Sequence, residues 1–453
     1  MPLDGDLAIN VLRPGDVLHT FSDPFGFGAL VHHEKHYNPN RFFSQYLNSV
    51  YFLTVPLFLQ HFTSPVDSIY LSCAILKMIV QLCLIYLFSI MATGRFSIFN
   101  TDFLIAAALI SSLFQTEGYN PYMGIIDQSI SYVFFYALPL VFLILLFLPL
   151  YMEIIFRKSL KPGWLQVVYY PVMALITCFS GPLNTGVILI IALILLCEVA
   201  VHAVRSKNNT SLLNRQLSSS VNKRSHVWLL VSLSILSLYS LYIGTFNLSN
   251  YNNIPLAEAY ARIPAGLYLH FTPKLGFPLL CLFVAFNSVF IKKWHFDDHG
   301  RKIWRFLMFM IVFTIIYIAL LPLGGYRPYR PNILRYDTAI PITAGFFVVF
   351  MITTLFVLKK SNWKLKPWYI ISLIGFVVLL TVNDNSRFNK NYCEKVSLLR
   401  IVAAPGDIVE LNSGCTVMAW DTISKPLESE FNAQLLLYWG VTKKKTLYFQ
   451  TGK

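Results

Sequence analysis

Long apolar segments alternate with short polar ones along most of the chain. A helix needs roughly 20 apolar residues to cross a hydrocarbon core about 30 Å thick. Ten segments reach or approach this length, and residues 42–62 are either an eleventh or a helix lying in the membrane interface. The pattern predicts an all-α polytopic membrane protein with about ten transmembrane helices. The ten segments are residues 68–92, 101–115, 131–152, 164–180, 186–201, 227–246, 272–291, 303–323, 339–358 and 367–382.

The same pattern predicts three regions. Residues 1–67 are a hydrophilic first loop with an amphipathic or interfacial helix, residues 68–383 are the transmembrane domain, and residues 384–453 are a small tail. In the tail, the apolar runs 398–402 and 408–411 are typical of short strands around a Pro-Gly-Asp turn. Two further candidate strands are residues 435–439 and 446–450.

Composition and charge support this interpretation and orient the chain. Of 453 residues, 56% are hydrophobic and only 13% are charged, which excludes a soluble domain of this size. Lysine and arginine collect in every second loop, and basic loops stay in the cytoplasm. The N-terminal region and the tail are therefore predicted to be extracytoplasmic. The net charge of +14 mostly reflects basic loops beside membrane lipid, so it gives no indication of nucleic-acid binding.

An external N-terminal region raises a question of export. More than sixty residues precede the first long apolar segment, and they contain no signal-peptide pattern. One interpretation is that an upstream first helix is missing and residues 1–67 form the first external loop. The alternative is that a short helix has been miscounted and this region is cytoplasmic. The first interpretation is favoured.

Carboxylates in the first loop are the candidate catalytic residues. Asp4 and Asp6 flank Gly5, and Asp23 precedes a proline. Acids held in such turns at a helix exit suit a general base or a divalent cation, with Asp4 and Asp6 as the metal candidates. The alternative is that these are ordinary solvated loop residues.

External arginines are the candidate anion-binding residues. The loop 324–338 breaks the charge bias of the other external loops, and its arginines alternate with tyrosines, which suits phosphate binding. Anchoring to lipid head groups is the alternative. A lysine within an apolar segment should also face a polar partner or cavity, because burying it costs at least ~2.5 kcal/mol. The alternative is that its side chain snorkels to the interface or that the segment is shifted. The six candidates are Arg41, Lys77, Arg262, Arg327, Arg330 and Arg335.

Two cysteines of the tail form a candidate disulfide. Cys393 and Cys415 share this external region, whereas the other five cysteines lie in apolar segments. In an oxidising compartment this pair could close a disulfide around a small folded tail.

Three classes of function fit this layout: a membrane glycosyltransferase, a transporter, or a non-catalytic envelope protein. The sequence contains no Walker loop, dinucleotide fingerprint, serine-nucleophile elbow or His-Glu-x-x-His motif. A transporter is disfavoured because the apolar segments carry no ladder of ionisable residues and no internal repeat.

The layout resembles the GT-C class of polytopic glycosyltransferases, with an acidic first external loop, about eleven helices and basic residues in a late external loop. The resemblance implies that Asp4 or Asp6 deprotonates the acceptor or positions Mg²⁺ or Mn²⁺. It implies that Arg327, Arg330 and Arg335 neutralise the departing phosphate of a polyprenyl-phosphate sugar donor. The chain departs from the pattern in lacking the first helix. A bacterial inner membrane is the expected location, and the sugar, the acceptor and the oligomeric state stay open.

Overall fold

Eight helices are long and apolar enough to cross a membrane within the part of the chain that the computed structural model describes. That part comprises residues 3–115, 123–158, 164–208, 224–248, 254–272, 275–325, 330, 332–361, 365–384 and 389–451. These lengths and compositions are those of an integral multi-pass membrane protein. The spans are α5 (Pro65–Thr93), α7 with η2 and α8 (Ile130–Tyr132, Val133–Ala137 and Leu138–Phe156), α10 (Pro182–Asn208), α12 (Arg224–Gly244), α15 (Gly276–Trp294), α16 (Asp298–Leu320) continuing into η4 (Leu321–Gly324), α17 (Tyr336–Lys360) and α18 (Lys366–Asn383).

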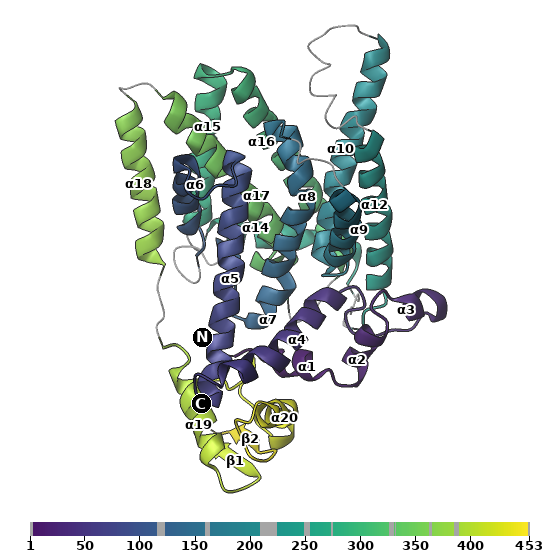
Figure 1. Cartoon of the computed structure of the whole chain (residues 1–453), viewed down its shortest axis with the longest axis vertical. Coiled ribbons are helices and arrows are strands. Elements are labelled where there is room, and N and C mark those ends of the chain that lie inside the picture. Colours follow the sequence, from purple (N-terminus) through teal and green to yellow (C-terminus); the bar gives the residue numbers. More distant parts are fainter. Residues whose placement is uncertain are drawn as a thin grey trace.

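Each of these spans overlaps one predicted segment, and the remaining two predicted segments form shorter helices. These are α6 (Thr101–Ser111) and α9 (Trp164–Cys178), which at 11 and 15 residues fall short of a full crossing. The predicted interface or eleventh segment is α4 (Phe42–Leu59), which crosses one end of the bundle obliquely (Figure 1).

The bundle has two chemically different ends. At the lower end of Figure 1 lie α1 (Leu7–Leu12), α2 (Gly15–Ser22), α3 (Phe27–His32), α4 and the tail. The upper end carries basic residues at the helix ends, among them Arg157, Lys158, Lys292, Lys293 and Lys359, and Lys359 pairs with Asp102 at 2.7 Å. Residues 1–67 and 384–453 therefore supply described segments to the same end of the bundle.

Helix α17 is the centre of the bundle. In its most apolar stretch, 89% of the residues are buried, against 22% in the corresponding stretch of the peripheral α18. Helix α17 packs on α5, α6, α15 and α16. A buried polar network joins α15, α17 and α18: the Asn287 amide donates to Thr353 and Thr354 at 3.1 Å, and the Tyr369 hydroxyl donates to Asn287 at 2.9 Å. Such hydrogen bonds hold helices together where lipid removes the hydrophobic driving force.

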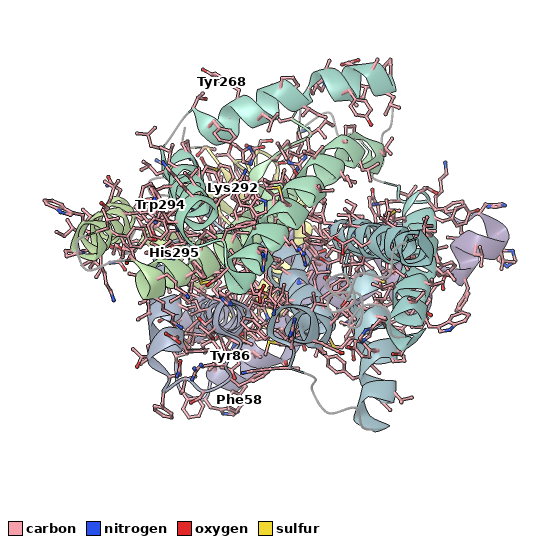
Figure 2. All side chains as sticks on the ribbon, turned by 90° about the horizontal axis from the view of Figure 1, so that it is seen from above. Phe58, Tyr86, Tyr268, Lys292, Trp294 and His295 are labelled. Carbon is pink, nitrogen blue, oxygen red and sulfur yellow. A yellow bond between two sulfur atoms is a disulfide. The ribbon has the colours of Figure 1, made fainter. Side chains whose placement is uncertain are left out.

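Two short helices border the bundle. Figure 2, seen from above, shows α13 (Leu256–Ala261) and α14 (Ile263–Phe271) along one edge, with the Tyr268 ring pointing outward. Tyr268 is 66% exposed, and aromatic residues of this kind gather at membrane–water interfaces.

The tail contains more helix than the sequence predicts. Its elements are α19 (Tyr392–Ala403), β1 (Ile408–Leu411), η5 (Pro426–Ser429), α20 (Glu430–Tyr438) and β2 (Leu447–Gln450), and the two strands pair in parallel. The predicted strands at 408–411 and 446–450 are found, but those at 398–402 and 435–439 are wrong because these residues belong to α19 and α20. A short apolar run does not distinguish strand from helix, and α19 buries its residues at helical spacing.

Candidate functional site

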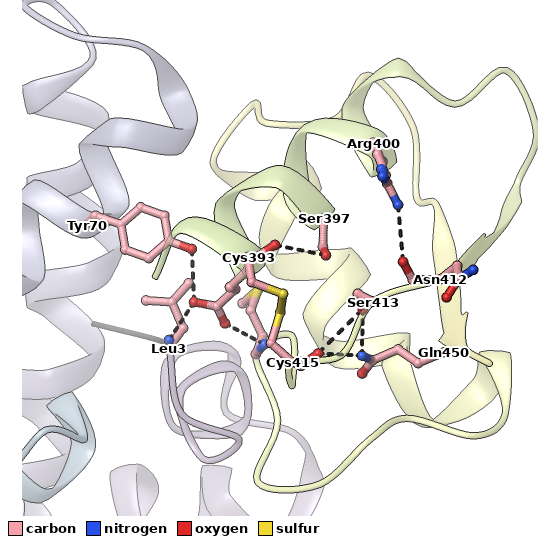
Figure 3. Close-up of a disulfide and its surroundings, with 11 residues drawn as sticks. Leu3, Tyr70, Cys393, Ser397, Arg400, Asn412, Ser413, Cys415 and Gln450 are labelled. Atoms are coloured by element: carbon pink, nitrogen blue, oxygen red, sulfur yellow. Dashed lines mark hydrogen bonds between the residues drawn. A yellow bond between two sulfur atoms is a disulfide. The ribbon is translucent and has the colours of Figure 1, made fainter. Parts of the chain in front are cut away.

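The tail is bound to both the N-terminal segment and the bundle through one buried carboxylate. Glu394 of α19 accepts hydrogen bonds from the Leu3 amide at 2.8 Å, the Met418 amide at 2.9 Å and the Tyr70 hydroxyl at 2.9 Å. Figure 3 shows this junction beside the disulfide that joins Cys393 to Cys415, the pair expected from the sequence. The junction therefore fixes the first residues of the chain against the tail.

Helix α20 forms a second contact of the tail with the bundle. The Trp439 indole donates to the Phe52 carbonyl at 2.8 Å, and the Gln60 amide donates to the Trp439 carbonyl at 2.7 Å. Trp439 and Phe52 are both fully buried. The tail is thus packed onto α4 rather than hanging as a separate unit.

The Glu394 junction predicts a pH-dependent stability of the tail. Burial raises the pKa of Glu394 from 4.5 to about 7, against the hydrogen bonds that lower it. The folded protein therefore keeps a proton that the unfolded chain releases, and stability falls as pH rises from 4.5 to about 7. We expect a loss of about 3 kcal/mol across this window, measured by hydrogen exchange of the tail amides. Glu394→Gln, which stays neutral, should remove this dependence, and an unchanged pH profile in that variant would contradict the assignment.

Asp4 is committed to holding the start of a membrane span. Its carboxylate accepts hydrogen bonds from the Ser129 hydroxyl at 2.8 Å and from the Ser131 hydroxyl and amide at 2.8 and 3.0 Å. Ser129 is the N-cap of α7, so Asp4 attaches the first residues of the chain to the beginning of the Ile130–Phe156 span. These contacts give Asp4 a positioning role.

Asp6 has a different environment from Asp4. It is half-buried, and its Oδ1 accepts a hydrogen bond of 3.1 Å from the indole of Trp420. Burial raises the pKa of Asp6, opposed by the Trp420 hydrogen bond and by the positive charges of Arg330 and Arg41. Asp6 thus lies near arginines that are distant in sequence, with a carboxyl pKa displaced in the direction that suits a general base.

The two described arginines between η4 and α17 hold one buried carboxylate. Arg335 binds Asp337 in a bidentate manner, with Nε to Oδ1 at 2.9 Å and Nη2 to Oδ2 at 2.8 Å. Arg330 reaches the same carboxylate through a single bond of 3.3 Å, donates to the Tyr132 hydroxyl, and lies 5.3 Å above the Tyr132 ring. Arg335 is therefore the bidentate partner of Asp337, whereas Arg330 divides its contacts between Asp337, Tyr132 and Tyr136.

Arg41 lies in a crevice next to this group. The crevice is narrow, with a volume of about 20 Å³, and lies between the start of α8, the turn before α10 and the start of α17. The Arg41 guanidinium lies 5.0 Å from the Phe135 ring, and Tyr136, which lines the same crevice, also hydrogen-bonds to Arg330. Tyr136 thus connects the crevice to the arginine beside Asp6.

A large apolar groove opens beside the crevice. It has a volume of about 250 Å³ and lies between α5, α8, α10, α16 and α17, and its lining is almost entirely aliphatic and aromatic. Leu140 and Pro341 line both the groove and the crevice, so the two spaces adjoin. At the other extreme of the groove lie Lys302 and Arg305, near the upper end of the bundle. The groove therefore extends from the basic end to the arginine cluster.

Lys77 finds polar partners within its span, as the cost of burying it requires. Its ammonium donates to the Gln128 carbonyl, and Lys390 of the tail donates to the Gln128 side chain at 2.7 Å. The neighbouring Asp127 has a raised pKa because of burial, opposed by bonds from the Ser129 amide and Tyr336 and by the charge of Lys77. This second polar group thus joins Lys77 of α5, Tyr336 of α17 and Lys390 of the tail.

The remaining candidates from the sequence lie outside the cluster, which is the group of Asp6, Arg41, Arg330, Arg335 and Asp337 with the residues that contact them. Asp23 accepts bonds from the amides of Phe27 and Gly28 at 2.8 and 2.7 Å, so it holds the start of α3. Arg262 pairs with Glu258 at 2.6 Å on the peripheral helix α13. Arg327 lies outside the described residues. Within the described ranges, no three His, Cys, Asp or Glu residues are grouped so that they could hold a metal ion. Among these residues, the metal pair expected at Asp4 and Asp6 therefore has no third ligand of these types.

Several residues of the cluster are not singled out by the sequence. The pairing of Asp337 with Arg335 could have been inferred, since an acid two positions after an arginine in a basic loop can form an ion pair with it. Tyr132 and Asp127 precede or begin an apolar segment without any distinguishing pattern. Trp420 lies in the tail, where only the fold brings it to Asp6.

No family model, curated protein or solved structure is detectably similar to this chain.

Proposed function

We propose that this protein is a glycosyltransferase that moves a sugar from a polyprenyl-phosphate carrier to an extracytoplasmic acceptor. The supporting observation is a continuous arrangement of apolar groove, crevice and charged cluster. The groove adjoins the crevice of Arg41 and Tyr136, Tyr136 bonds to Arg330, and Arg330 lies near Asp6. A polyprenyl-phosphate sugar has a long apolar chain, a phosphate and a reactive sugar, in this order. The groove suits the chain, the arginines suit the phosphate, and Asp6 suits the reacting end.

Two independent features support an extracytoplasmic position for the lower end. The upper end carries the lysine and arginine of its turns, and basic loops stay in the cytoplasm. The lower end carries the Cys393–Cys415 disulfide, and disulfides persist in oxidising compartments. Both support a position of Asp6 and Arg330 on the side opposite the cytosol, in a membrane such as the bacterial inner membrane.

The reaction would be a direct displacement at the anomeric carbon. The Asp6 carboxylate takes the proton of the acceptor hydroxyl while that oxygen bonds to the anomeric carbon. The bond between this carbon and the phosphate oxygen breaks, and its electron pair leaves with the phosphate. Arg330 and Arg41 stabilise the negative charge that develops there, an effect typically worth a few kcal/mol per donor.

The donor class can be tested with purified full-length protein in liposomes. Radiolabelled polyprenyl-monophosphate sugars, polyprenyl-pyrophosphate sugars and nucleotide sugars are offered separately, with crude envelope acceptors and with Mg²⁺, Mn²⁺ or chelator. We expect sugar transfer from the lipid-linked donors and no transfer from the nucleotide sugars. Transfer only from nucleotide sugars would contradict the role of the groove. Movement of the lipid-linked sugar across the bilayer without transfer would indicate a transporter instead.

Gly5 should be required for the position of Asp6. A Cβ at Gly5 would lie 2.8 Å from both the Trp420 amide nitrogen and Cδ1, and 3.2 Å from the Ala419 Cα. Gly5→Ala must therefore displace Asp6 or the 419–420 backbone, and we expect transfer to fall about tenfold without global unfolding. Gly414→Ala is the matched control, since its Cβ would meet nothing within 4 Å. Equal transfer by the two variants would show that this close contact does not position Asp6.

A further inference from the structure

Trp420 presents half of its indole beside the candidate base. Its side of the tail faces the start of the chain, and Trp420 is 50% exposed although Nε1 donates to Asp6. Its ring centroid lies 5.6 Å from that of Tyr132 at an interplanar angle of 45°. Tyr132 in turn carries the guanidinium of Arg330. An exposed aromatic surface thus adjoins both the carboxylate and the cation of the cluster.

The loop that carries Trp420 is held rigidly on several sides. Cys415 is bound to α19 by the disulfide, and the Val417 carbonyl accepts a bond from the Tyr448 hydroxyl at 2.9 Å. Met418 donates to Glu394 and accepts from the Asn432 amide at 3.0 Å. The indole is therefore presented in a fixed orientation, which lowers the entropic cost of binding a ligand on it.

From this arrangement we infer that Trp420 is part of an acceptor site for a carbohydrate. The inference rests on the proposed function and names the acceptor class. The face of an aromatic ring carries negative partial charge and attracts polarised C–H groups. A pyranose offers C–H groups on its face and hydroxyl groups at its rim. A sugar stacked on Trp420 places one of its rim hydroxyl groups at Asp6, close to the edge of the indole. This hydroxyl is the group that Asp6 must deprotonate in the reaction.

Binding can be measured apart from transfer. Full-length protein in nanodiscs is titrated with methyl glycosides of glucose, galactose and mannose, with glycerol as a polyol lacking a ring, and binding is followed by saturation-transfer NMR. We expect pyranosides to bind and glycerol not to bind. Trp420→Ala should weaken pyranoside binding about tenfold, the scale of one aromatic stacking contact, and Trp420→Phe should weaken it less. Trp294→Phe is the matched control, since Trp294 is 55% exposed and is the last residue of α15, whose end toward α16 lies at the upper end of the bundle (Figure 1).

The outcomes separate this inference from the proposed function. Unchanged pyranoside binding in Trp420→Ala, or equal binding of glycerol, would overturn the carbohydrate site. Quenching of Trp420 emission by brominated lipid without any response to pyranosides would make Trp420 an interfacial anchor and also overturn it. Transfer by Trp420→Ala with an unchanged acceptor KM would overturn the inference and leave the transferase intact. Trp420-dependent pyranoside binding without transfer from any lipid-linked donor would leave the carbohydrate site intact and overturn the transferase.

Discussion

Replacement of Asp6 by asparagine is expected to abolish transfer while the fold stays intact. Asparagine keeps the side-chain oxygen that accepts the Trp420 bond at 3.1 Å but cannot take the proton of the acceptor. Loss of a general base typically lowers the rate by about 10²–10⁴-fold. The expected loss is in kcat/KM for the acceptor, measured at a saturating concentration of the lipid-linked donor.

The stability of Asp6→Asn distinguishes a catalytic from a structural role. Because burial raises the pKa of Asp6, the ionised carboxylate is disfavoured in the folded protein, and a neutral amide should leave thermal stability unchanged or slightly higher. The matched control is Asp407→Asn, which removes an exposed carboxylate paired with Lys444 in the same end of the molecule. An exposed pair contributes little, so this variant should transfer normally. Transfer by Asp6→Asn at the wild-type rate would remove Asp6 from the mechanism.

The pH profile provides a second measurement on the same residue. If Asp6 is the base, transfer rises with pH as its carboxyl group loses a proton, and its raised pKa places this rise above the range of an ordinary aspartate. The opposing charges of Arg330 and Arg41 mean that Arg330→Ala should move the rise to still higher pH.

The sequence identifies the kinds of groups in the cluster but not their roles. Asp4 and Asp6 flank the same glycine and look equivalent in a single sequence. Their difference arises because the serines of the α7 cap bind Asp4, whereas an indole from the distant tail meets Asp6. These contacts join positions separated by 125 and 414 residues, and no local pattern encodes them.

The helices were predictable for the opposite reason. The length of an apolar run near 20 residues is set by the thickness of the membrane, and each of the eight long spans in the described part of the chain overlaps a predicted segment. In the tail, by contrast, residues 398–402 pack as helix α19 because Leu398 and Ile401 share a buried face with Glu394. A run of five residues carries too little periodicity to show this.

Arg330→Ala is expected to lower transfer about 10²–10³-fold, the usual effect of removing one group that stabilises developing charge. If Arg330 also binds the phosphate before the reaction, the KM for the donor rises as well. The fold should survive, because Asp337 keeps both bonds from Arg335 and one from the Thr338 amide at 2.9 Å. Ethylguanidinium in the assay should restore part of the rate, while ethylammonium, which lacks the planar fork, should restore less.

Arg335→Ala provides the contrast that makes the assignment specific. Asp337 is only 1% exposed, and without Arg335 its carboxylate would be left with the single 3.3 Å bond from Arg330 and the Thr338 amide. Breaking a buried pair in this way typically costs about 3–5 kcal/mol, so this variant should lose thermal stability before its donor KM can be compared. If instead Arg335→Ala stayed stable with a raised donor KM and Arg330→Ala unfolded, the roles of the two arginines would be exchanged. The donor phosphate would then bind on the Arg335 side of Asp337, farther from the carboxylate of Asp6, and direct displacement assisted by Arg330 would no longer explain the site.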